Sequence, residues 1–210
     1  MDEDGRILVW TGQAESVPLS AFPSLQVEQQ HPGQHDQPTH ITLPRESHIP
    51  EAERRQLTVM FCDLVDSTAL SGQLDPEEYR EVVRTYQTAC TEIIRRYDGH
   101  IAQLLGDGLL VYFGYPVAHE DDPLRAVQTG LGIVEEIGAL HNRLERDKGI
   151  HLAVRLGIHT GLVVVGAMGS QGRQEQLALG QVPNIACRIQ GLAAPNTIVV
   201  SEGSSAKVTL

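Results

Sequence analysis

The sequence predicts one α+β domain in which helices pack against a largely antiparallel sheet. Short runs of β-branched and aromatic residues, each bounded by turn residues, are typical of strands. Two longer stretches repeat apolar residues every three or four positions, as amphipathic helices do. The order strand, helix, hairpin, helix, hairpin, helix, strand indicates an α+β sandwich. The 210 residues are enough for one such domain with its core.

The first predicted strand and helix follow from local signals. The strand spans 56–62 and delivers Asp63 at its carboxyl end. The helix begins after Asp75, because this residue is a good N-cap and a proline follows it. Its apolar stripe continues to Tyr97, and Gly99 is predicted to stop it.

Two hairpins, two helices and a last strand complete the predicted domain. The first hairpin turns at Gly106-Asp107-Gly108, whose residues suit a tight turn, so we expect Asp107 at its tip. A second hairpin is predicted around Thr160-Gly161. These strands span 101–105, 109–113, 152–159, 162–167 and 198–201, and the helices 122–144 and 182–192. We expect the helices to lie on one face of the sheet.

The chain divides into a flexible N-terminal tail or linker at 1–50, a folded domain at 51–203 and a short tail at 204–210. Residues 11–50 are rich in Pro, Gln, His and Ser and lack apolar periodicity, so they cannot bury enough surface to fold. The irregular spacing of the histidines favours solvated side chains over a metal site. These histidines are His31, His35, His40 and His48.

Composition excludes several classes of protein. The net charge is -11 and basic residues cluster only in adjacent pairs, so no nucleic-acid partner is expected. Cys62, Cys90 and Cys187 stand singly, which excludes a disulfide framework or zinc site and predicts core residues in a reducing compartment. The acidic N-terminus and the lack of a long apolar run predict a cytoplasmic protein without a membrane span.

Two aspartates at predicted turns carry the chemistry. Mg²⁺ takes oxygen ligands and keeps coordination positions for substrate phosphates. Asp63 and Asp107 would therefore suit two ions about 4 Å apart, as in phosphoryl-type transfer. Taken alone, each is better explained locally, Asp63 as a cap and Asp107 as a good hairpin residue.

Three segments, in this order, change that interpretation. They are Phe61-Cys-Asp-Leu-Val-Asp-Ser-Thr68, Leu105-Gly-Asp-Gly-Leu-Leu-Val-Tyr-Phe-Gly114 and Gly180-Gln-Val-Pro-Asn-Ile-Ala-Cys-Arg188. The first two resemble the metal-binding segments of class III adenylyl and guanylyl cyclases, and the third resembles the transition-state helix of that family. The resemblance runs from about Arg54 to Ser201 and is nearest to bacterial adenylyl cyclases related to the soluble, bicarbonate-responsive branch.

The resemblance implies a ferredoxin-like, cyclase-homology sandwich that converts ATP to 3′,5′-cyclic AMP and pyrophosphate in intracellular signalling. It also implies that Asp63 and Asp107 bind two Mg²⁺ or Mn²⁺ ions, with the carbonyl of Leu64 as a further ligand. Asn184 would position the ribose, and Arg188 would stabilise charge on the α-phosphate. The β- and γ-phosphates would be cradled by backbone amides of Val65, Asp66, Ser67 and Thr68.

Three positions depart from the family pattern. Asp66 replaces a glycine often found there, and we expect it to cap the following helix, since a third carboxylate would repel the triphosphate. Gln103 and Leu177 stand where adenylyl cyclases of this class commonly carry a Lys and an Asp or Thr that read the base. Gln103 can pair with adenine or guanine, whereas Leu177 offers only packing. The surrounding sequence favours ATP, and GTP stays open.

The resemblance also concerns assembly. In this family the metal residues face the Asn/Arg pair across a dimer interface, which implies a head-to-tail homodimer with two shared sites. Residues 169–176 match the arm that reaches across, although a plain surface loop explains them as well. Lys207 lies outside any match to the family's C-terminal phosphate-binding hairpin, which is compatible with a truncated end. A guanylyl cyclase and a catalytically silent nucleotide-binding dimerisation module therefore stay open as alternatives.

Overall fold

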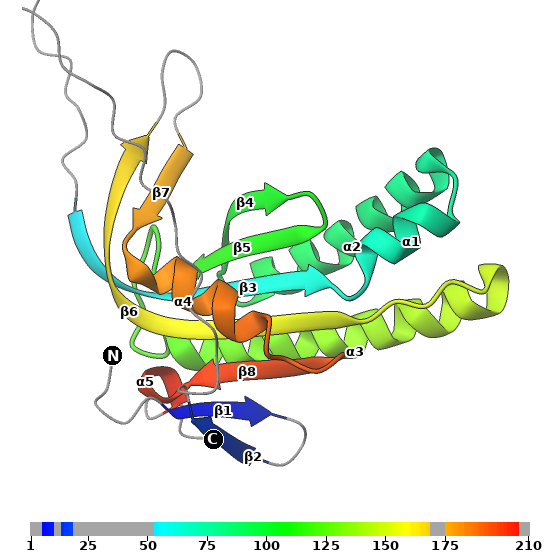
Figure 1. Ribbon diagram of the computed structural model, residues 1–210. Helices are drawn as coiled ribbons and strands as arrows, with labels where there is room; N and C mark the ends of the chain where they lie inside the picture. Colours follow the sequence, from blue (N-terminus) through cyan, green and yellow to red (C-terminus); the bar gives the residue numbers. More distant parts are fainter. Residues whose placement is uncertain (1–5, 11–13, 19–52, 169–174, 206–210) are drawn as a thin grey trace, which may run out of the picture.

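A long sheet runs through the part of the chain that the computed structural model describes, residues 6–10, 14–18, 53–168 and 175–205 (Figure 1). Its strands are β1 (Arg6–Trp10), β2 (Ala14–Pro18), β3 (Glu53–Leu64), β4 (His100–Leu105), β5 (Gly108–Phe113), β6 (Val154–Met168), β7 (Glu175–Leu179) and β8 (Thr197–Ser201). The helices are α1 (Ser67–Gln73), α2 (Pro76–Arg96), α3 (Asp122–Lys148), α4 (Gln181–Gln190) and α5 (Glu202–Ser205).

The strands follow the order β2-β1-β8-β6-β3-β5-β4, and β7 pairs with β6 beside that path. Strands β6 and β8 run parallel, and the remaining pairs are antiparallel. This largely antiparallel sheet, with helices packed on it, confirms the predicted fold class.

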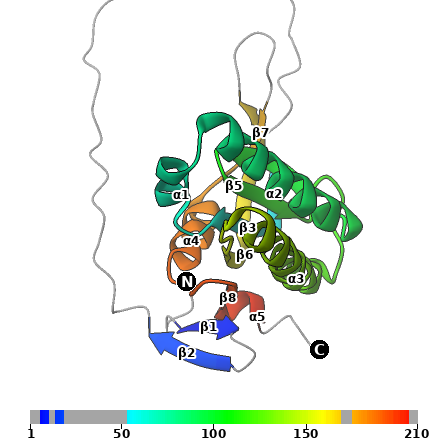
Figure 2. The ribbon, with the colours of Figure 1, turned by 90° about the vertical axis from the view of Figure 1, so that its right-hand side faces the viewer.

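Helices α2 and α3 cover one face of the sheet (Figure 2). Met60, Cys62 and Leu64 of β3 point to this face, since alternate side chains of a strand share a side. They form a buried cluster with residues of both helices, among them Tyr86 and Ile137. The hydroxyl of Tyr86 shares a hydrogen bond with the Cys62 thiol at 3.3 Å, which satisfies a polar group inside this core.

Helix α4 lies on the opposite face, so the prediction that the helices share one face is wrong. Leu57 and Val59 of β3 form a second buried cluster with Val182 and Ala186 of α4. The reason is visible in β5, where all six residues are buried. A strand buried on both sides needs a cover on each face, and α4 supplies the second cover.

A single strand, β6, replaces the hairpin predicted around Thr160-Gly161. It runs for 15 residues and pairs with β3 from Glu53↔Val165 to Leu64↔Val154. Gly161 pairs with Leu57 within this ladder, and a Cβ atom there would meet the Val182 side chain at 2.7 Å. The glycine therefore serves close packing by α4 rather than a turn.

The N-terminal strands β1 and β2 were not predicted. They pair with each other, and β1 extends the sheet at the edge of β8. The four histidines between 31 and 48 and Lys207 lie outside the described residues. The division at residues 50 and 203 stays a prediction.

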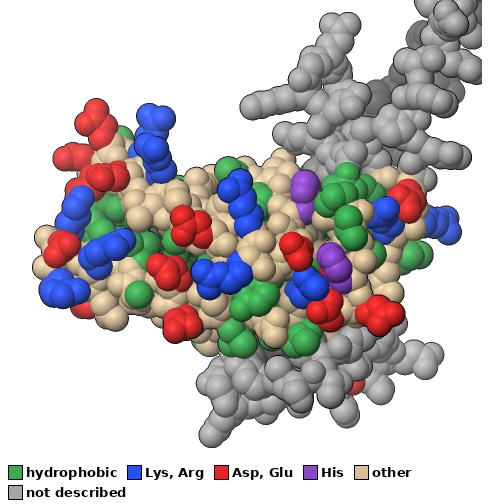
Figure 3. Space-filling model, turned by 180° about the vertical axis from the view of Figure 1, so that it is seen from behind, with side chains coloured by type: hydrophobic (Ala, Val, Ile, Leu, Met, Phe, Trp, Pro, Cys, Tyr) green, Lys and Arg blue, Asp and Glu red, His purple; other side chains and the backbone are tan. Residues whose placement is uncertain are grey.

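Two surface features bear on the predictions from composition. Cys62 and Cys90 are buried as expected, whereas Cys187 is exposed, so its assignment to the core is wrong. Acidic and basic side chains intermingle on the face shown in Figure 3, without a continuous basic patch there. Among the described residues, no helix combines the length and the hydropathy needed to cross a membrane.

Candidate active site

Asp63 and Asp107 reach the same place from two elements. Asp63 is the next-to-last residue of β3, and Asp107 lies in the turn between β4 and β5, which is closed by the pair Leu105↔Gly108. Strand β5 pairs with β3, with Cys62 opposite Leu109, and this pairing carries the turn to the end of β3 (Figure 1). The predicted position of Asp107 at the hairpin tip is confirmed.

The two carboxyl groups are in contact. Burial, a hydrogen bond with the Asp107 carboxyl and the charge of that group together raise the pKa of Asp63 from 3.8 to about 6. One oxygen of Asp107, Oδ2, is buried and has no hydrogen-bond partner among the described residues. Two acids forced together, one with an unpaired buried oxygen, are stabilised by a bound cation. The residues present therefore fit a divalent-cation site of oxygen ligands.

Arg155 is a member of this site that sequence reasoning missed. It lies on β6 directly opposite Asp63, and its charge lowers the pKa of Asp63 against the larger effects of burial and Asp107. Its Nε is buried without a hydrogen-bond partner in the described structure. A lone arginine within an apolar strand was an available signal, but its neighbour depends on the register between β3 and β6.

Tyr79 is a second residue that the sequence analysis did not assign. It lies in the first turns of α2, and its hydroxyl hydrogen bonds with Ser67. Burial and the nearby charge of Asp107 raise its pKa, the first being the larger cause. The sequence showed Tyr79 only as a member of the apolar stripe, so its polar end was overlooked.

The turn after β3 only partly matches the predicted phosphate cradle. The Val65 amide donates to the Ala153 carbonyl at 2.9 Å, so it is already occupied, unlike the prediction. Asp66 stands at the N-cap of α1, exposed and with a left-handed backbone at φ 53, but makes no capping hydrogen bond. The expected cap bond is therefore wrong. Ser67 and Thr68 begin α1, whereas the side chain of Leu64 is buried below the turn.

Helix α4 presents Asn184 and Arg188 to solvent. Both are exposed, while Val182 and Ala186 hold the helix on the sheet. Within the described residues, Arg188 forms no ion pair, and the cation that acts on Asp63 is Arg155. In the described part of the chain, the two aspartates thus come together while Asn184 and Arg188 stay exposed on α4.

The predicted base-reading residues lie on two strands that do not pair with each other, β4 and β7. Gln103 is half-buried on β4, opposite Leu110 of β5. Leu177 lies on β7, where its backbone pairs with Gly166, and its side chain is outside the described residues. Strands β4 and β7 contact each other, although β7 pairs only with β6 within the described sheet. Residues 169–174 of the predicted arm are also outside the described residues.

Comparison with known proteins decides the family. Residues 49–209 match the model of the adenylate and guanylate cyclase catalytic domain. The chain belongs to this family. Adenylate cyclase 1 of Rhizobium meliloti (strain 1021) is 33% identical over 142 residues, which are 67% of this chain and 21% of that protein. Cytidylate cyclase of Escherichia coli is 34% identical in an alignment that covers 70% of this chain and 35% of that protein.

Solved structures of cyclases share the fold. The guanylyl cyclase Cya2 matches with a TM-score of 0.73 and 31% identity, over 76% of this chain and 81% of that one. The adenylyl cyclase CyaB from P. aeruginosa matches with a TM-score of 0.71 and 29% identity, over 75% of this chain and 82% of that one. Sequence and fold therefore both show the cyclase family. The relatives are named for different nucleotides, as adenylyl, guanylyl and cytidylate cyclases.

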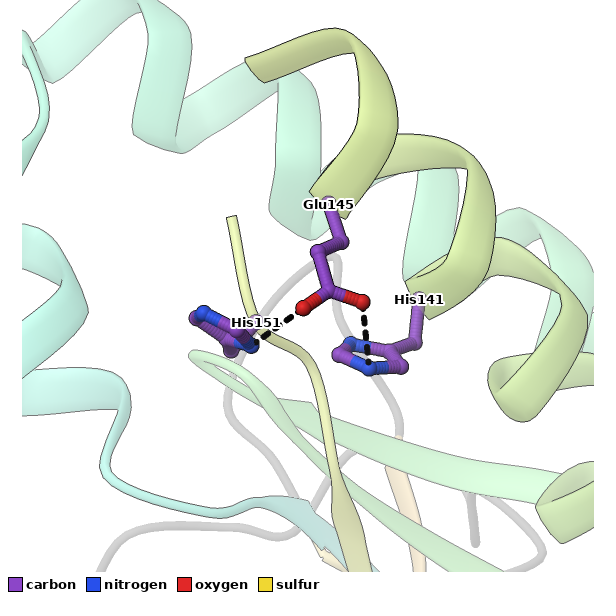
Figure 4. A group of neighbouring side chains, drawn as sticks. All are labelled: His141, Glu145 and His151. Carbon is purple, nitrogen blue, oxygen red and sulfur yellow. Dashed lines mark ion pairs between the residues drawn. The ribbon is translucent and has the colours of Figure 1, made fainter. Parts of the chain in front are cut away.

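This cyclase domain carries a further group of potential metal ligands at the carboxyl end of α3 (Figure 4). Glu145 lies 3.4 Å from Nε2 of His141 and 3.6 Å from Nδ1 of His151. The Leu152 amide, however, donates to Nδ1 of His141 at 3.2 Å. The neutral His141 ring must then carry its proton on Nε2, the atom that faces Glu145. This group fits a polar contact between Glu145 and the two histidines better than a metal site, because a metal bound by His141 would need the Nε2 lone pair.

Proposed function

We propose that this domain is an adenylyl cyclase that converts ATP to 3′,5′-cyclic AMP and pyrophosphate. The observation that carries the proposal is the contact between the Asp63 and Asp107 carboxyls at the ends of two neighbouring elements. A chain has no evident structural use for two repelling acids with an unpaired buried oxygen. Binding of a nucleotide with its divalent cations would explain why the two acids lie together. An intracellular signalling role in the cytoplasm, where ATP is available, accords with that substrate.

Asp63 and Asp107 would hold two Mg²⁺ or Mn²⁺ ions, with the Leu64 carbonyl as a further oxygen ligand. When bound, such ions supply positive charge that favours deprotonation of the ribose 3′-hydroxyl and neutralises the triphosphate. The amides of Asp66, Ser67 and Thr68 would bind terminal phosphate oxygens, since Val65 already has a partner. The guanidinium of Arg155, whose Nε is buried, adds a cation beside Asp63.

We propose that Asn184 and Arg188 act on the substrate from the partner subunit. Their exposure on α4, and the lack of an ion pair for Arg188 within the described chain, support a head-to-tail homodimer in which each site combines two surfaces. Asn184 would orient the ribose. Arg188 would stabilise the charge that develops on the α-phosphate as the 3′-oxygen attacks and pyrophosphate leaves.

ATP is the preferred substrate because adenylate cyclases stand among the similar bacterial proteins. GTP is the second candidate, since Gln103 offers both a donor and an acceptor to a base edge and the guanylyl cyclase Cya2 is 31% identical. The whole proteins are much longer than this chain, which covers 21% of Adenylate cyclase 1.

The test is a direct comparison of ATP, GTP and CTP as substrates of the purified protein with Mn²⁺ and with Mg²⁺. We expect cyclic AMP as the main product. Asp107→Ala should reduce the rate by at least about 1000-fold, because it removes a ligand shared by both ions, and should leave the circular dichroism spectrum unchanged. A wild-type protein that forms no cyclic nucleotide, or an Asp107→Ala variant with the wild-type rate, would overturn the proposal.

A further inference from the structure

Helix α2 contacts the turn that carries Asp107 through one side chain. The amide Nε2 of Gln87 donates a hydrogen bond to the Gly106 carbonyl at 2.7 Å. Gly106 precedes Asp107 and adopts a left-handed backbone with φ 68. A bond to this carbonyl fixes the peptide plane from which Asp107 extends. It links two residues that are 19 positions apart in the sequence.

The β4 side of this turn has little side-chain packing, although its backbone pairs with β5 at Leu105↔Gly108. The residues on its β4 side, Leu104 and Leu105, are 54% and 43% exposed, so apolar packing contributes little there. A Cβ atom on Gly106 would meet nothing within 4 Å. Side chains of α2 form the wall of a shallow depression beside the turn. Its lining includes Tyr79, Val83, Gln87, Gly106 and Asp107.

The position of Asp107 must be accurate for the proposed chemistry. Divalent cations such as Mg²⁺ demand near-ideal ligand geometry, and displacements of about 1 Å are costly. A two-residue turn whose β4 flank is exposed does not supply that accuracy by itself. The hydrogen bond from Gln87 can fix the position of the turn, because α2 is itself firmly held. The other face of this helix is anchored in the core by Val82, Tyr86 and Cys90.

We propose that Gln87 is a positioning residue of the active site, which fixes the Gly106-Asp107 turn so that Asp107 can share cations with Asp63. This inference rests on the proposed function, because it concerns the same pair of aspartates. Gln87 does not touch the reacting atoms in this proposal. It acts through the Gly106 carbonyl, and its loss should weaken cation binding without unfolding the domain.

The test compares Gln87→Leu with a matched control, Gln128→Leu. Leucine has nearly the size of glutamine but cannot donate a hydrogen bond. Gln128 is also half-buried on a long helix, α3, and lies outside the active site. For Gln87→Leu we expect the Mn²⁺ concentration that gives half-maximal activity to rise about 3- to 10-fold, as fits the loss of one hydrogen bond. The rate at saturating Mn²⁺ and the melting temperature without metal should stay close to those of the wild type.

A second readout does not depend on turnover. Mn²⁺ binding is followed by the electron paramagnetic resonance signal of the free ion, in the presence of 3′-deoxy-ATP, which lacks the attacking hydroxyl. Gln87→Leu should weaken this binding by a similar factor, and Gln128→Leu should leave it unchanged. Equal Mn²⁺ binding by wild type and Gln87→Leu would overturn the inference even if the enzyme is active. A wild type that binds Mn²⁺ but cyclises no nucleotide would instead count against the proposed function alone.

Discussion

At the scale of single residues, the site combines two acids at a cost in stability. The raised pKa of Asp63, about 6 against an ordinary 3.8, means that the folded protein holds this proton more tightly than the unfolded chain. The free energy of unfolding of the metal-free protein therefore decreases as the pH rises from about 4 to above 6. Removing the charge of Asp107 should relieve part of this loss.

We predict that Asp107→Asn abolishes cyclase activity and raises the melting temperature of the metal-free protein by a few degrees well above that pKa. The gain is on the order of 1 kcal/mol, because Asp63 is half-exposed and solvent screens the repulsion. Well below the pKa the gain should vanish, since Asp63 is then protonated in the wild type. Differential scanning fluorimetry across pH with a chelator measures this.

The matched control is Asp98→Asn. Asp98 has a favourable partner, because Arg125 donates to its Oδ2 at 2.7 Å, and its left-handed backbone at φ 57 suits asparagine equally well. This substitution should not raise the melting temperature at any pH. A gain for Asp98→Asn as large as that for Asp107→Asn would show that the effect is one of net charge and not of the aspartate pair.

At the scale of elements, close approach of α4 to the sheet depends on Gly157. A Cβ atom at this position would collide with the Ala186 carbonyl and the Gln190 amide, both backbone groups of α4 that cannot rotate away. Gly157→Ala should therefore displace α4 and cost about 1–3 kcal/mol. The variant should still fold but should lose most of its cyclase activity, because the same helix carries Asn184 and Arg188.

The comparison for that prediction is Gly138→Ala. Gly138 lies inside α3, and a Cβ atom there meets nothing within 4 Å. Alanine in an open helical position should stabilise the protein by about 0.5–1 kcal/mol and leave activity unchanged. Urea unfolding and cyclase assays on both variants measure the contrast. A neutral Gly157→Ala would mean that α4 moves freely on the sheet.

Sequence signals found elements well where the cause was local. The N-cap and proline at Asp75-Pro76 gave the start of α2, and the glycines around Asp107 gave a two-residue turn. The prediction of a second hairpin was wrong, because Gly161 was interpreted as a turn residue. Gly161 instead pairs with Leu57 of β3 and lies against the Val182 side chain of α4. Such partners come from tertiary pairing, which overrides local turn preference.

At the scale of the whole molecule, the meeting of Asp63 and Asp107 was predictable and that of Asp63 and Arg155 was not. The first needs only a hairpin beside a strand end, which motif order suggested. To predict the second contact, one must know the register between β3 and β6, in which Asp63 pairs with Arg155. These two residues are more than 90 positions apart in the sequence. The placement of α4 on the far face from α2 and α3 likewise depends on the finished sheet.

The two halves of the proposed site lie on different elements, which allows a test by mixing inactive variants. Asp63→Ala lacks a metal ligand, and Arg188→Ala lacks the cation that acts from α4. In a head-to-tail dimer, a mixed pair has one site without defects. Random exchange makes half of the dimers mixed, each with one intact site of two, so we expect recovery of about one quarter of the wild-type activity.

Mixing Asp63→Ala with Asp107→Ala is the control for shared sites. Both defects then fall on the same half of the site, so each site of a mixed dimer lacks one aspartate and no activity should return. The assay uses equimolar mixtures, with heterodimer formation measured by native mass spectrometry. Recovery in the control would show that subunits complement by another route. Absence of recovery in the first mixture, with heterodimers present, would mean that Arg188 serves the aspartates of its own chain.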